Sequence, residues 1–495
     1  MSGFERVDVV IVGARCAGSA TAVALSERGV RVVALDSAKF PSDTLSTHLL
    51  WPSGLAEIDA IGALAAVEAI GAPRLPVAFG DLEGVQFRNT YTPVAGIDYG
   101  MCIRRVKLDQ VLVERARASG ADVREGCRVT SLVIESGRVV GVRYNEGTSS
   151  PREVRAKFVI GADGRRSTVA KLVGALDRPL RESPSGRACF FAYWKDGRSE
   201  LRHVGAQWRV GDLLGTAFPC DDGRLLSLLQ PPVSIADEFR GKNKQAAYLE
   251  MIEKIPGLAE RLQGCELDSR VLSATDITSY FRRSSGPGWA LPGDSGHFKD
   301  PVTAQGIRDA IRYGRLLGET LAPVVGRDDR SVDAAVREWA WMREKDCIGI
   351  YQLTNDFARG AAATPLEFEV YRRAARDPEY ARIFADVFCR TKEPSALTRP
   401  GPMLAMAAKA LLNKQTDRRA LASDLRTRAV AAVRDYLERA EVSRRGRRGG
   451  LTPIAPSLRE SLAWEMAAVE DPHGTEIPDS SPARTHAVVT SAAEQ

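Results

Sequence analysis

Two glycines and an aspartate near the start of the chain have the types and spacing needed to bind a dinucleotide. Gly13 and Gly18 enclose the turn GARCAG, and Asp36 follows at the end of the next apolar run, close to the spacing of about 20 residues found in dinucleotide sites. Backbone N–H groups of such a turn and the positive end of the next helix attract a pyrophosphate, and the acid accepts from a ribose hydroxyl. The pattern therefore predicts a dinucleotide site.

The elements that must hold this turn can be read on either side of it. An apolar run from Val7 to Val12 predicts a strand buried on both faces of a parallel sheet. Residues 16–28 have a helical pattern, and residues 30–35 form a second apolar run that ends at Asp36. The segment is therefore predicted to be a βαβ unit.

Arg15 departs from the usual turn, in which a third glycine lets the backbone approach the phosphates. We expect its guanidinium group to contact the pyrophosphate and to add charge where glycine would give access. The alternative is an arginine that points to solvent.

Two later stretches place further acids at strand ends. Phe158 to Ile160 is an apolar run that stops in GADGRRST, where Asp163 and Gly164 precede a helix capped by Ser167 or Thr168. Trp289 to Leu291 stops at Gly293 and Asp294, and a helix is expected to begin near residues 303–307.

With these three motifs in this order, residues 5–325 resemble the flavoprotein monooxygenases of the p-hydroxybenzoate hydroxylase type, within the superfamily that includes flavin halogenases and geranylgeranyl reductases. The resemblance implies that FAD is the cofactor and that NAD(P)H, or a separate flavin reductase, supplies electrons. It assigns cofactor contacts to Gly13, Arg15, Gly18, Asp36, Arg105, Val129, Asp163, Gly164, Gly293, Asp294, Pro301, Gln305, Gly306 and Ile307. Of these, it places Arg105 at the phosphates or ribityl chain, Val129 at the adenine, and Pro301 to Ile307 at the flavin ring.

The resemblance also implies an α/β fold: a Rossmann-like FAD-binding domain, an inserted antiparallel-sheet substrate domain and a C-terminal helical region. The FAD-binding domain would comprise residues 1–73, 98–182 and 276–325, and the substrate domain residues 74–97 and 183–275. Four apolar runs between residues 189 and 229, separated by turns, are expected to form a meander that roofs the substrate pocket. Six aromatic residues of these strands could line the pocket, and no more than a third of them are expected to contact ligand: Phe190, Phe191, Tyr193, Trp194, Trp208 and Phe218.

The rest of the chain has a different character. Residues 326–440 read as helices, and residues 441–495, rich in Pro, Ser, Gly and charge, as a disordered tail. The basic cluster from Arg444 to Arg448 is expected to be solvated, because no aromatic residues are interspersed in it and glycines interrupt any helix. We therefore expect no nucleic-acid partner.

Candidate catalytic groups occur on the two loops that the resemblance places beside the flavin. They are His48, His297, Lys299 and Asp300. Histidine or carboxylate could deprotonate a substrate, and the lysine could act through its charge. No histidine or cysteine spacing typical of a metal site occurs.

Composition favours a cytoplasmic enzyme acting on a small molecule. The eight cysteines are scattered, as in a reducing compartment, and the net charge of +6 is small for 495 residues. No leader precedes the first strand, and no run of about 18 apolar residues could form a membrane span.

The activity implied by the resemblance is hydroxylation of an aromatic or polyketide-like molecule with dioxygen, through a flavin C4a-hydroperoxide. A geranylgeranyl-reductase-like activity remains an alternative, because HFKDPVTAQGI is close to loops of that branch. A flavin halogenase is a weaker alternative, because the segment VGAQWRV and Lys39 do not match its GWxWxIP motif and active-site lysine.

Overall fold

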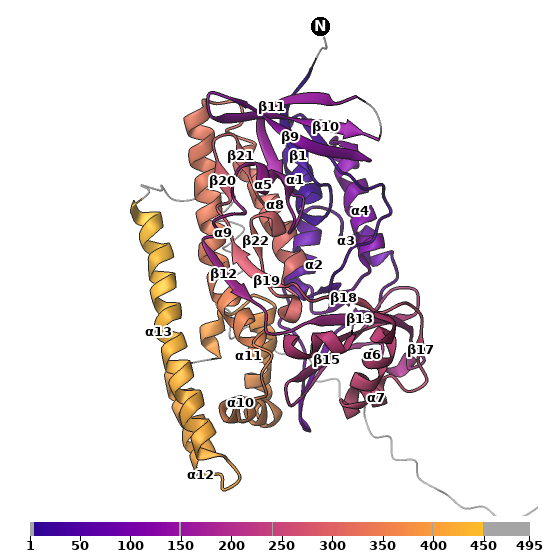
Figure 1. Ribbon diagram of the computed structural model, residues 1–495, viewed down its shortest axis with the longest axis vertical. Coiled ribbons are helices and arrows are strands. Elements are labelled where there is room, and N and C mark those ends of the chain that lie inside the picture. Colours follow the sequence, from indigo (N-terminus) through magenta and orange to yellow (C-terminus); the bar gives the residue numbers. More distant parts are fainter. Residues whose placement is uncertain (1–3, 148–149, 240, 398, 449–495) are drawn as a thin grey trace, which may run out of the picture.

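The computed structural model describes residues 4–147, 150–239, 241–397 and 399–448. Figure 1 shows a sheet with helices against it, a second sheet at the opposite end, and a set of C-terminal helices that runs along both. The predicted α/β fold, with a second sheet and a C-terminal helical region, is confirmed.

The first sheet grows from the predicted βαβ unit. Strand β1 pairs in parallel with β2 and with β11, so the strand before the glycine turn lies in the centre of the sheet. Its inner residues, Val9 to Ile11, are fully buried, as the continuous apolar run predicts. The main path of the sheet is β20 (Ser285–Gly286), β21 (Trp289–Ala290), β11 (Arg152–Gly161), β1 (Glu5–Val12), β2 (Val32–Leu35) and β8 (Asp122–Arg124), and β9 (Cys127–Glu135) and β10 (Arg138–Glu146) continue from β11.

Helices α1 (Cys16–Ser26) and α8 (Gly306–Leu321) pack closely in the largest core. Glycines on α8 make this possible: a Cβ atom on Gly314 would lie 2.5 Å from the backbone oxygen of Ala17, and one on Gly318 would lie 2.6 Å from the Ala24 side chain. The same core includes residues of α2 (Pro52–Ala60), α3 (Leu64–Glu68) and α4 (Arg105–Ala118). The N-terminus of α8 is thereby fixed relative to the glycine turn of α1.

The second sheet joins two distant parts of the chain. Its order is β17 (Glu266–Leu267), β13 (Cys189–Lys195), β16 (Arg224–Leu229), β15 (Leu213–Pro219), β14 (Val204–Val210), β5 (Val77–Leu82) and β6 (Val85–Asn89), and β18 (Leu272–Ala274) also pairs with β13. The four predicted strands are present, but the simple meander is wrong, because β13 pairs with β16 and not with β14. The β14–β5 pair is parallel, since these strands come from separate segments and no hairpin connects them.

Further helices and two small sheets complete this region. Helices α6 (Lys244–Glu253) and α7 (Pro256–Arg261) cover one face of the second sheet, and their apolar residues share a core with it. Two small sheets lie between the two large ones. One has the order β3 (Leu49–Leu50), β7 (Gly100–Cys102), β4 (Arg74–Leu75), and the other the order β12 (Arg181–Pro184), β19 (Thr278–Phe281), β22 (His297–Phe298).

The C-terminal region is helical, as its sequence predicts. Its described helices are α9 (Asp329–Phe357), α10 (Pro365–Arg376), α11 (Pro378–Phe388), α12 (Pro400–Leu412) and α13 (Arg418–Arg448). Helices α10 and α11 are separated at Asp377, which leaves the helical conformation and caps α11 by accepting from Tyr380 N at 3.1 Å. The proline that follows starts the new helix.

The predicted start of a disordered tail at residue 441 is wrong for the residues that the structure describes, because α13 continues to Arg448. Trp341 on α9 donates its indole N–H to the Val442 carbonyl at 2.9 Å, and Arg445 forms an ion pair with Glu344 at 2.6 Å. These tertiary contacts outweigh the low helix propensity of Gly446. The remainder of the predicted tail, residues 449–495, lies outside the described residues.

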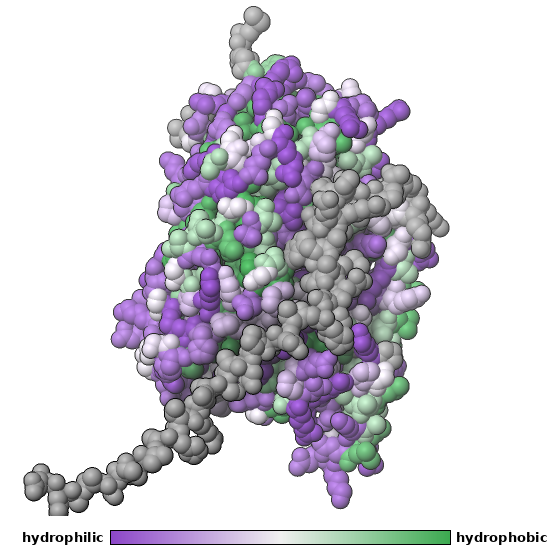
Figure 2. All heavy atoms as spheres, turned by 180° about the vertical axis from the view of Figure 1, so that it is seen from behind, coloured by the Kyte–Doolittle hydropathy of each residue, from purple (hydrophilic) through white to green (hydrophobic). Residues whose placement is uncertain are grey.

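Several large apolar side chains lie exposed on α12 and α13, which form an outer edge of the molecule (Figures 1 and 2). They are Leu404, Leu411, Leu412, Leu425, Val430, Val433, Tyr436 and Leu437. In the described part of the chain, no helix combines the length and the hydropathy that crossing a bilayer requires.

Candidate active site

A large cleft opens where β1, β2 and β11 end and the two helices α1 and α8 begin. It contains about 2040 Å³ of space free of protein atoms, part of it open to solvent. Carboxyl ends of parallel strands are where open α/β sheets bind nucleotides. Most of the predicted cofactor residues line it: Gly13, Arg15, Asp36, Arg105, Val129, Asp163, Gly164, Asp294, Pro301, Gly306 and Ile307.

The two glycines of the first turn, Gly13 and Gly18, are required because neighbouring backbone atoms lie too close for a side chain. Gly13 has φ +95°, and a Cβ atom there would lie 2.5 Å from the Ala162 carbonyl oxygen. A Cβ atom on Gly18 would lie 1.8 Å from the Gly13 oxygen, so Gly18 supports the turn from the helix and does not itself line the cleft. Helix α1 has no acidic residue in its first turn, which leaves its N-terminal N–H groups available to an anion.

Asp36 lies at one end of the cleft, with residues 127–129 of β9. Its carboxylate accepts from Ala14 N at 2.7 Å and from Ala38 N at 2.8 Å. It therefore holds the glycine turn, and a carboxylate has lone pairs left for a ribose hydroxyl. Val129 contributes to the same end of the cleft, where the adenine was expected.

Arg15 and Arg105 share one buried carboxylate. Arg15 Nη1 lies 2.5 Å from Asp109, and Arg105 Nε lies 2.9 Å from the other oxygen of that carboxylate. Arg15 also donates to the Ser42 carbonyl and hydroxyl, each at 3.0 Å, and so ties the 40–46 loop to the turn. Two cations against one anion leave a net positive charge beside the turn, which suits a pyrophosphate.

Two aspartates at strand ends behave differently. Asp163 caps the first turn of α5 (Thr168–Leu172) by accepting from Thr168 N at 2.6 Å and from the Ser167 hydroxyl at 2.5 Å. The side chain of Asp294 makes no hydrogen bond with the described residues. Burial raises the pKa of this carboxyl, and the charges of Arg165 and Arg105 oppose that rise only in part. An unpaired, half-buried carboxylate on the cleft wall is a ready acceptor for a hydroxyl-bearing ligand.

Lys299 is the one catalytic candidate that lines the cleft. Its ammonium group forms a salt bridge with Asp309 and donates to His297 Nε2 at 2.9 Å, while His297 Nδ1 lies 3.1 Å from the Tyr280 carbonyl oxygen. The contact with a carbonyl places the imidazole proton on Nδ1, so the ring is neutral. Burial and the Lys299 charge hold the pKa of His297 well below its usual value.

His297, Asp309 and Cys347 bring three potential metal ligands within 4.8 Å of one another. The Lys299 ammonium group bonds two of the three, so a positive charge already occupies the centre of this group. The arrangement is that of a buried ion pair rather than a cation site.

The remaining candidates lie behind the wall of the cleft. His48 is fully buried with φ +59°, and its Nε2 atom lies 2.6 Å from the Tyr193 hydroxyl. Burial lowers the pKa of His48 to about 3. Asp300 caps the short helix after it by accepting from Val302 N at 2.9 Å, and the Gln305 amide donates to the Phe388 carbonyl at 2.9 Å. Gly293 also lies outside the cleft lining.

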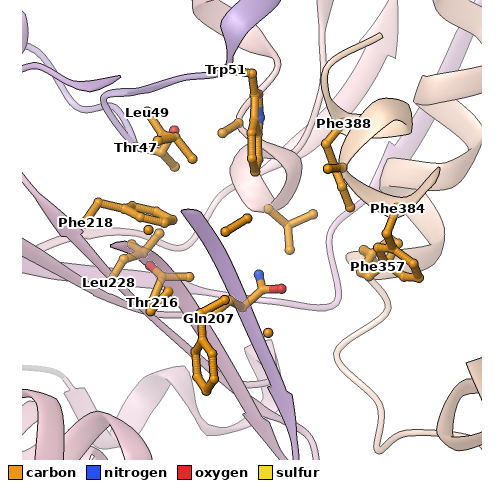
Figure 3. Close-up of a pocket in the computed structure, with 18 of the residues that line it drawn as sticks. Thr47, Leu49, Trp51, Gln207, Thr216, Phe218, Leu228, Phe357, Phe384 and Phe388 are labelled. Atoms are coloured by element: carbon orange, nitrogen blue, oxygen red, sulfur yellow. The ribbon is translucent and has the colours of Figure 1, made fainter. Parts of the chain in front are cut away.

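An apolar pocket adjoins the cleft beneath the second sheet (Figure 3). It contains about 810 Å³ of space free of protein atoms, its mouth included. The two cavities share four wall residues: Thr47, Leu228, Pro301 and Ala304. The pocket therefore borders the part of the cleft lined by Pro301 and Ala304, where the flavin ring was expected.

Of the six aromatic residues proposed for the roof, one lines this pocket and one lines the cleft. They are Phe218 and Phe191, respectively. Phe190, Trp194 and Trp208 point to the other face of the sheet, where they pack in the core beneath α6 and α7, and Tyr193 contacts His48. The alternation of side chains along each strand decides this division.

Sequence reasoning missed several residues of the site. Asp109 was not among the predicted site residues, although its position four residues after Arg105 is typical of an i, i+4 ion pair. Arg165 lines the cleft, and its guanidinium group lies 4.9 Å from the ring centre of Phe298. Gln207 and Gln230 line the apolar pocket, and no local sequence pattern marks them.

Comparison with known proteins identifies the cofactor. Residues 6–185 match the model of the FAD binding domain family. The chain is 25% identical over 323 residues to the tryptophan 2-halogenase of Chondromyces crocatus, which covers 64% of this chain and 61% of that enzyme. It is 28% identical over 339 residues to digeranylgeranylglycerophospholipid reductase 1 of Methanopyrus kandleri, covering 66% of this chain and 82% of the reductase.

The fold is also similar to that of PqsL, a probable FAD-dependent monooxygenase from Pseudomonas aeruginosa. The TM-score is 0.60 at 19% identity, and the match covers 77% of this chain and 99% of that one. The glycine cradle, the unpaired Asp294 carboxylate and the size of the cleft fit an FAD molecule. The chain is therefore an FAD-dependent oxidoreductase that carries an FAD binding domain and is similar to flavin halogenases and geranylgeranyl reductases.

Proposed function

We propose that this protein is a monooxygenase that uses NAD(P)H and dioxygen to hydroxylate an aromatic or polyketide-like small molecule. The observation that carries the proposal is the junction of the two cavities at Thr47, Leu228, Pro301 and Ala304. An apolar substrate in the pocket would lie against the flavin end of the cleft, sheltered from water by the second sheet.

The predicted FAD-binding residues would hold different parts of the cofactor at the two ends of the cleft. Asp36 and Val129 would hold the adenosine, Arg15 and Arg105 the pyrophosphate, and Asp294 the ribityl chain. Bound FAD would supply the electron transfer and the activation of dioxygen. The chain's own contribution is to orient the substrate, to exclude water and to hold charge near the reacting atoms.

Lys299 is the residue best placed to hold that charge. Lys299 lines the cleft, and its buried ammonium group is fixed behind the wall by Asp309 and His297. A fixed cation stabilises negative charge that develops on the cofactor or oxygen without having to reorganise. His48 and Asp300, which lie behind the cleft wall, would position the neighbouring loops, and no proton transfer is assigned to them.

The test is an assay of the purified holoenzyme with NAD(P)H in air and candidate aromatic polyketides. We expect NAD(P)H oxidation that accelerates with substrate, and one atom of labelled dioxygen in the product. Lys299→Met should retain FAD and lower the turnover rate by about tenfold or more, in the range reported for the loss of one electrostatic contact. Product without label would exclude the monooxygenase proposal.

Reduction of an isoprenoid is a second candidate, favoured by the 28% identity to the digeranylgeranylglycerophospholipid reductase. Such an enzyme would transfer hydride to a prenyl double bond and would not need oxygen. Rapid anaerobic turnover of a geranylgeranyl substrate would therefore replace the first proposal with the second. A halogenated product that requires added halide would instead indicate the activity of the halogenase relative.

A further inference from the structure

We propose that the apolar pocket selects an uncharged, flat substrate that carries a hydrogen-bonding oxygen, and that Gln207, Thr216 and Gln230 recognise this oxygen. The inference rests on the proposed function in one respect: it takes the pocket of Figure 3 to be where the substrate lies. It adds the chemical class of that substrate and the residues that choose it.

The charge of the substrate follows from the walls. Among the residues that line the pocket, none is an aspartate, glutamate, lysine, arginine or histidine. A carboxylate or phosphate placed there would lose its hydration without gaining an opposite charge, which is strongly unfavourable. The pocket therefore discriminates against charged molecules.

The polar residues form a row on one face of the second sheet. Gln207 on β14 lies directly opposite Thr216 on β15, and Thr216 lies opposite Leu228 on β16. Gln230 follows Leu228 by two positions, at the end of the strand, and lines the same pocket. On the other side of Gln207, β5 presents Gly80, where the Phe87 ring takes the place of a side chain, since a Cβ atom there would lie 2.7 Å from that ring.

These polar groups are left without partners by the protein. Figure 3 shows the Gln207 amide directed into the pocket, and it makes no hydrogen bond with the described residues. Thr216 Oγ1 and Gln230 Nε2 are buried and also lack a partner. Because buried polar groups are nearly always paired, the two buried unpaired groups of Thr216 and Gln230, beside the partly exposed Gln207 amide, indicate that a ligand supplies the missing partner. Amides and a hydroxyl can donate to a neutral carbonyl, and they can both donate to and accept from a hydroxyl.

The shape of the substrate follows from the aromatic walls. Trp51 and Phe388 are stacked with ring centres 5.7 Å apart, and they face the polar row across the pocket. Phe218 and Phe384 close the sides. Rings arranged in this way offer their faces and edges to a flat unsaturated molecule.

The test measures binding to the FAD-loaded protein through the change in flavin absorbance, without turnover. The probes are 2-naphthol, naphthalene and 2-naphthoate, which share one ring system and differ in the polar group. We expect 2-naphthol to bind about tenfold more tightly than naphthalene, as one satisfied hydrogen bond allows, and 2-naphthoate to bind more weakly than either.

The variants assign the preference to residues. Gln207→Leu and Thr216→Val should each lower the affinity for 2-naphthol and leave that for naphthalene unchanged, and Gln207→Lys should shift the preference toward 2-naphthoate. Gln263→Ala, at an exposed position away from the pocket, is the control. Thr216→Val keeps the volume of the side chain, so its result stands if a variant at Gln207 fails to fold.

The inference is overturned if 2-naphthoate binds as tightly as 2-naphthol, if the variants leave the naphthol preference intact, or if no probe perturbs the flavin. Failure of the proposed function looks different. A protein that prefers 2-naphthol in this way but incorporates no oxygen into any product would retain the pocket assignment and lose the monooxygenase proposal.

Discussion

At the scale of single residues, several groups chosen for cofactor chemistry also hold the protein together. Asp36 accepts two backbone N–H bonds, Asp163 caps a helix, and Arg15 ties a loop to the glycine turn. Each of these contacts shapes the site before any ligand arrives. Substitutions at these positions therefore change both the preorganisation of the site and its contacts with FAD.

Asp36→Ala is expected to lower FAD affinity by about 10- to 100-fold, because it removes a ribose acceptor and the bond that holds Ala14 N. The measurement is FAD content after purification, followed by titration of the apoprotein with FAD. Asp59→Ala, at an exposed position, is the control and should bind FAD like the parent. Full FAD content in Asp36→Ala would contradict the assignment of the ribose.

His48 should make stability depend on pH. Its folded pKa of about 3 lies below the value of 6.5 for the unfolded chain, so between these values only the unfolded chain takes up the proton. The stabilisation is complete above pH 6.5 and is lost as the pH falls toward 3. It amounts to about 2 kcal/mol between pH 6.5 and pH 5.

The check is urea denaturation at pH 7.5 and pH 5.0. His48→Asn should shrink the difference between the two unfolding free energies by about 2 kcal/mol, and asparagine tolerates the left-handed backbone at this position. His203→Asn, at an exposed position, should leave the difference unchanged. If the difference between the unfolding free energies at pH 7.5 and pH 5.0 is the same in all three proteins, His48 is not held in its neutral form by burial.

At the scale of elements, the contact between α1 and α8 sets the geometry of the site. The N-termini of both helices point to the cleft, and glycines on α8 allow the two helix backbones to approach closely. The distance between the pyrophosphate end and the flavin end of the site is therefore fixed by helix packing, in a dense core with little freedom to adjust.

Gly314→Ala should consequently destabilise the protein by about 1 to 3 kcal/mol, the usual cost of overpacking. Its added Cβ atom would meet the Ala17 carbonyl, which is backbone and cannot rotate away. Gly326→Ala has open space around its Cβ atom and serves as the control in urea denaturation. A Gly314→Ala protein as stable as the parent would mean that the two helices pack less closely.

At the scale of the whole molecule, the FAD cleft draws on regions far apart in the sequence. Its wall includes residues of the first sheet, the 44–47 loop, strand β16 of the second sheet and helix α8. A ligand that contacts all of them binds the folded chain and not the unfolded one. Its binding free energy therefore adds directly to the stability of the fold.

Removal of FAD should lower the melting temperature, and added FAD should restore it in a concentration-dependent way. At a free FAD concentration about 100 times the Kd, the stabilisation is about 2.7 kcal/mol. Differential scanning calorimetry of apoprotein and reconstituted protein measures the effect, with FMN, which lacks the adenosine half, as the matched ligand. An apoprotein that melts at the same temperature with and without FAD would show that the folded chain does not bind FAD at that concentration.

Much of the fold could be predicted from local signals. Composition and spacing predict the parallel strand of Val9 to Ile11, the glycine turn and the strand-end acids, because each is a property of a short segment. The cap of α5 was predicted to be Ser167 or Thr168 for the same reason, and it is Ser167. The length of α13 was not predicted, because it depends on contacts with Trp341 and Glu344, about one hundred positions earlier in the chain.

The sequence by itself therefore determined the cofactor class and the order of the motifs that bind it, because backbone N–H groups, glycine and carboxylates act through local geometry. Only the tertiary structure decided that Lys299 reaches the cleft while His48 lies behind it, and that Gln207 and Thr216 meet in one pocket. These facts depend on strand register and on which face of a sheet each side chain occupies, and a shift of one residue would reverse them.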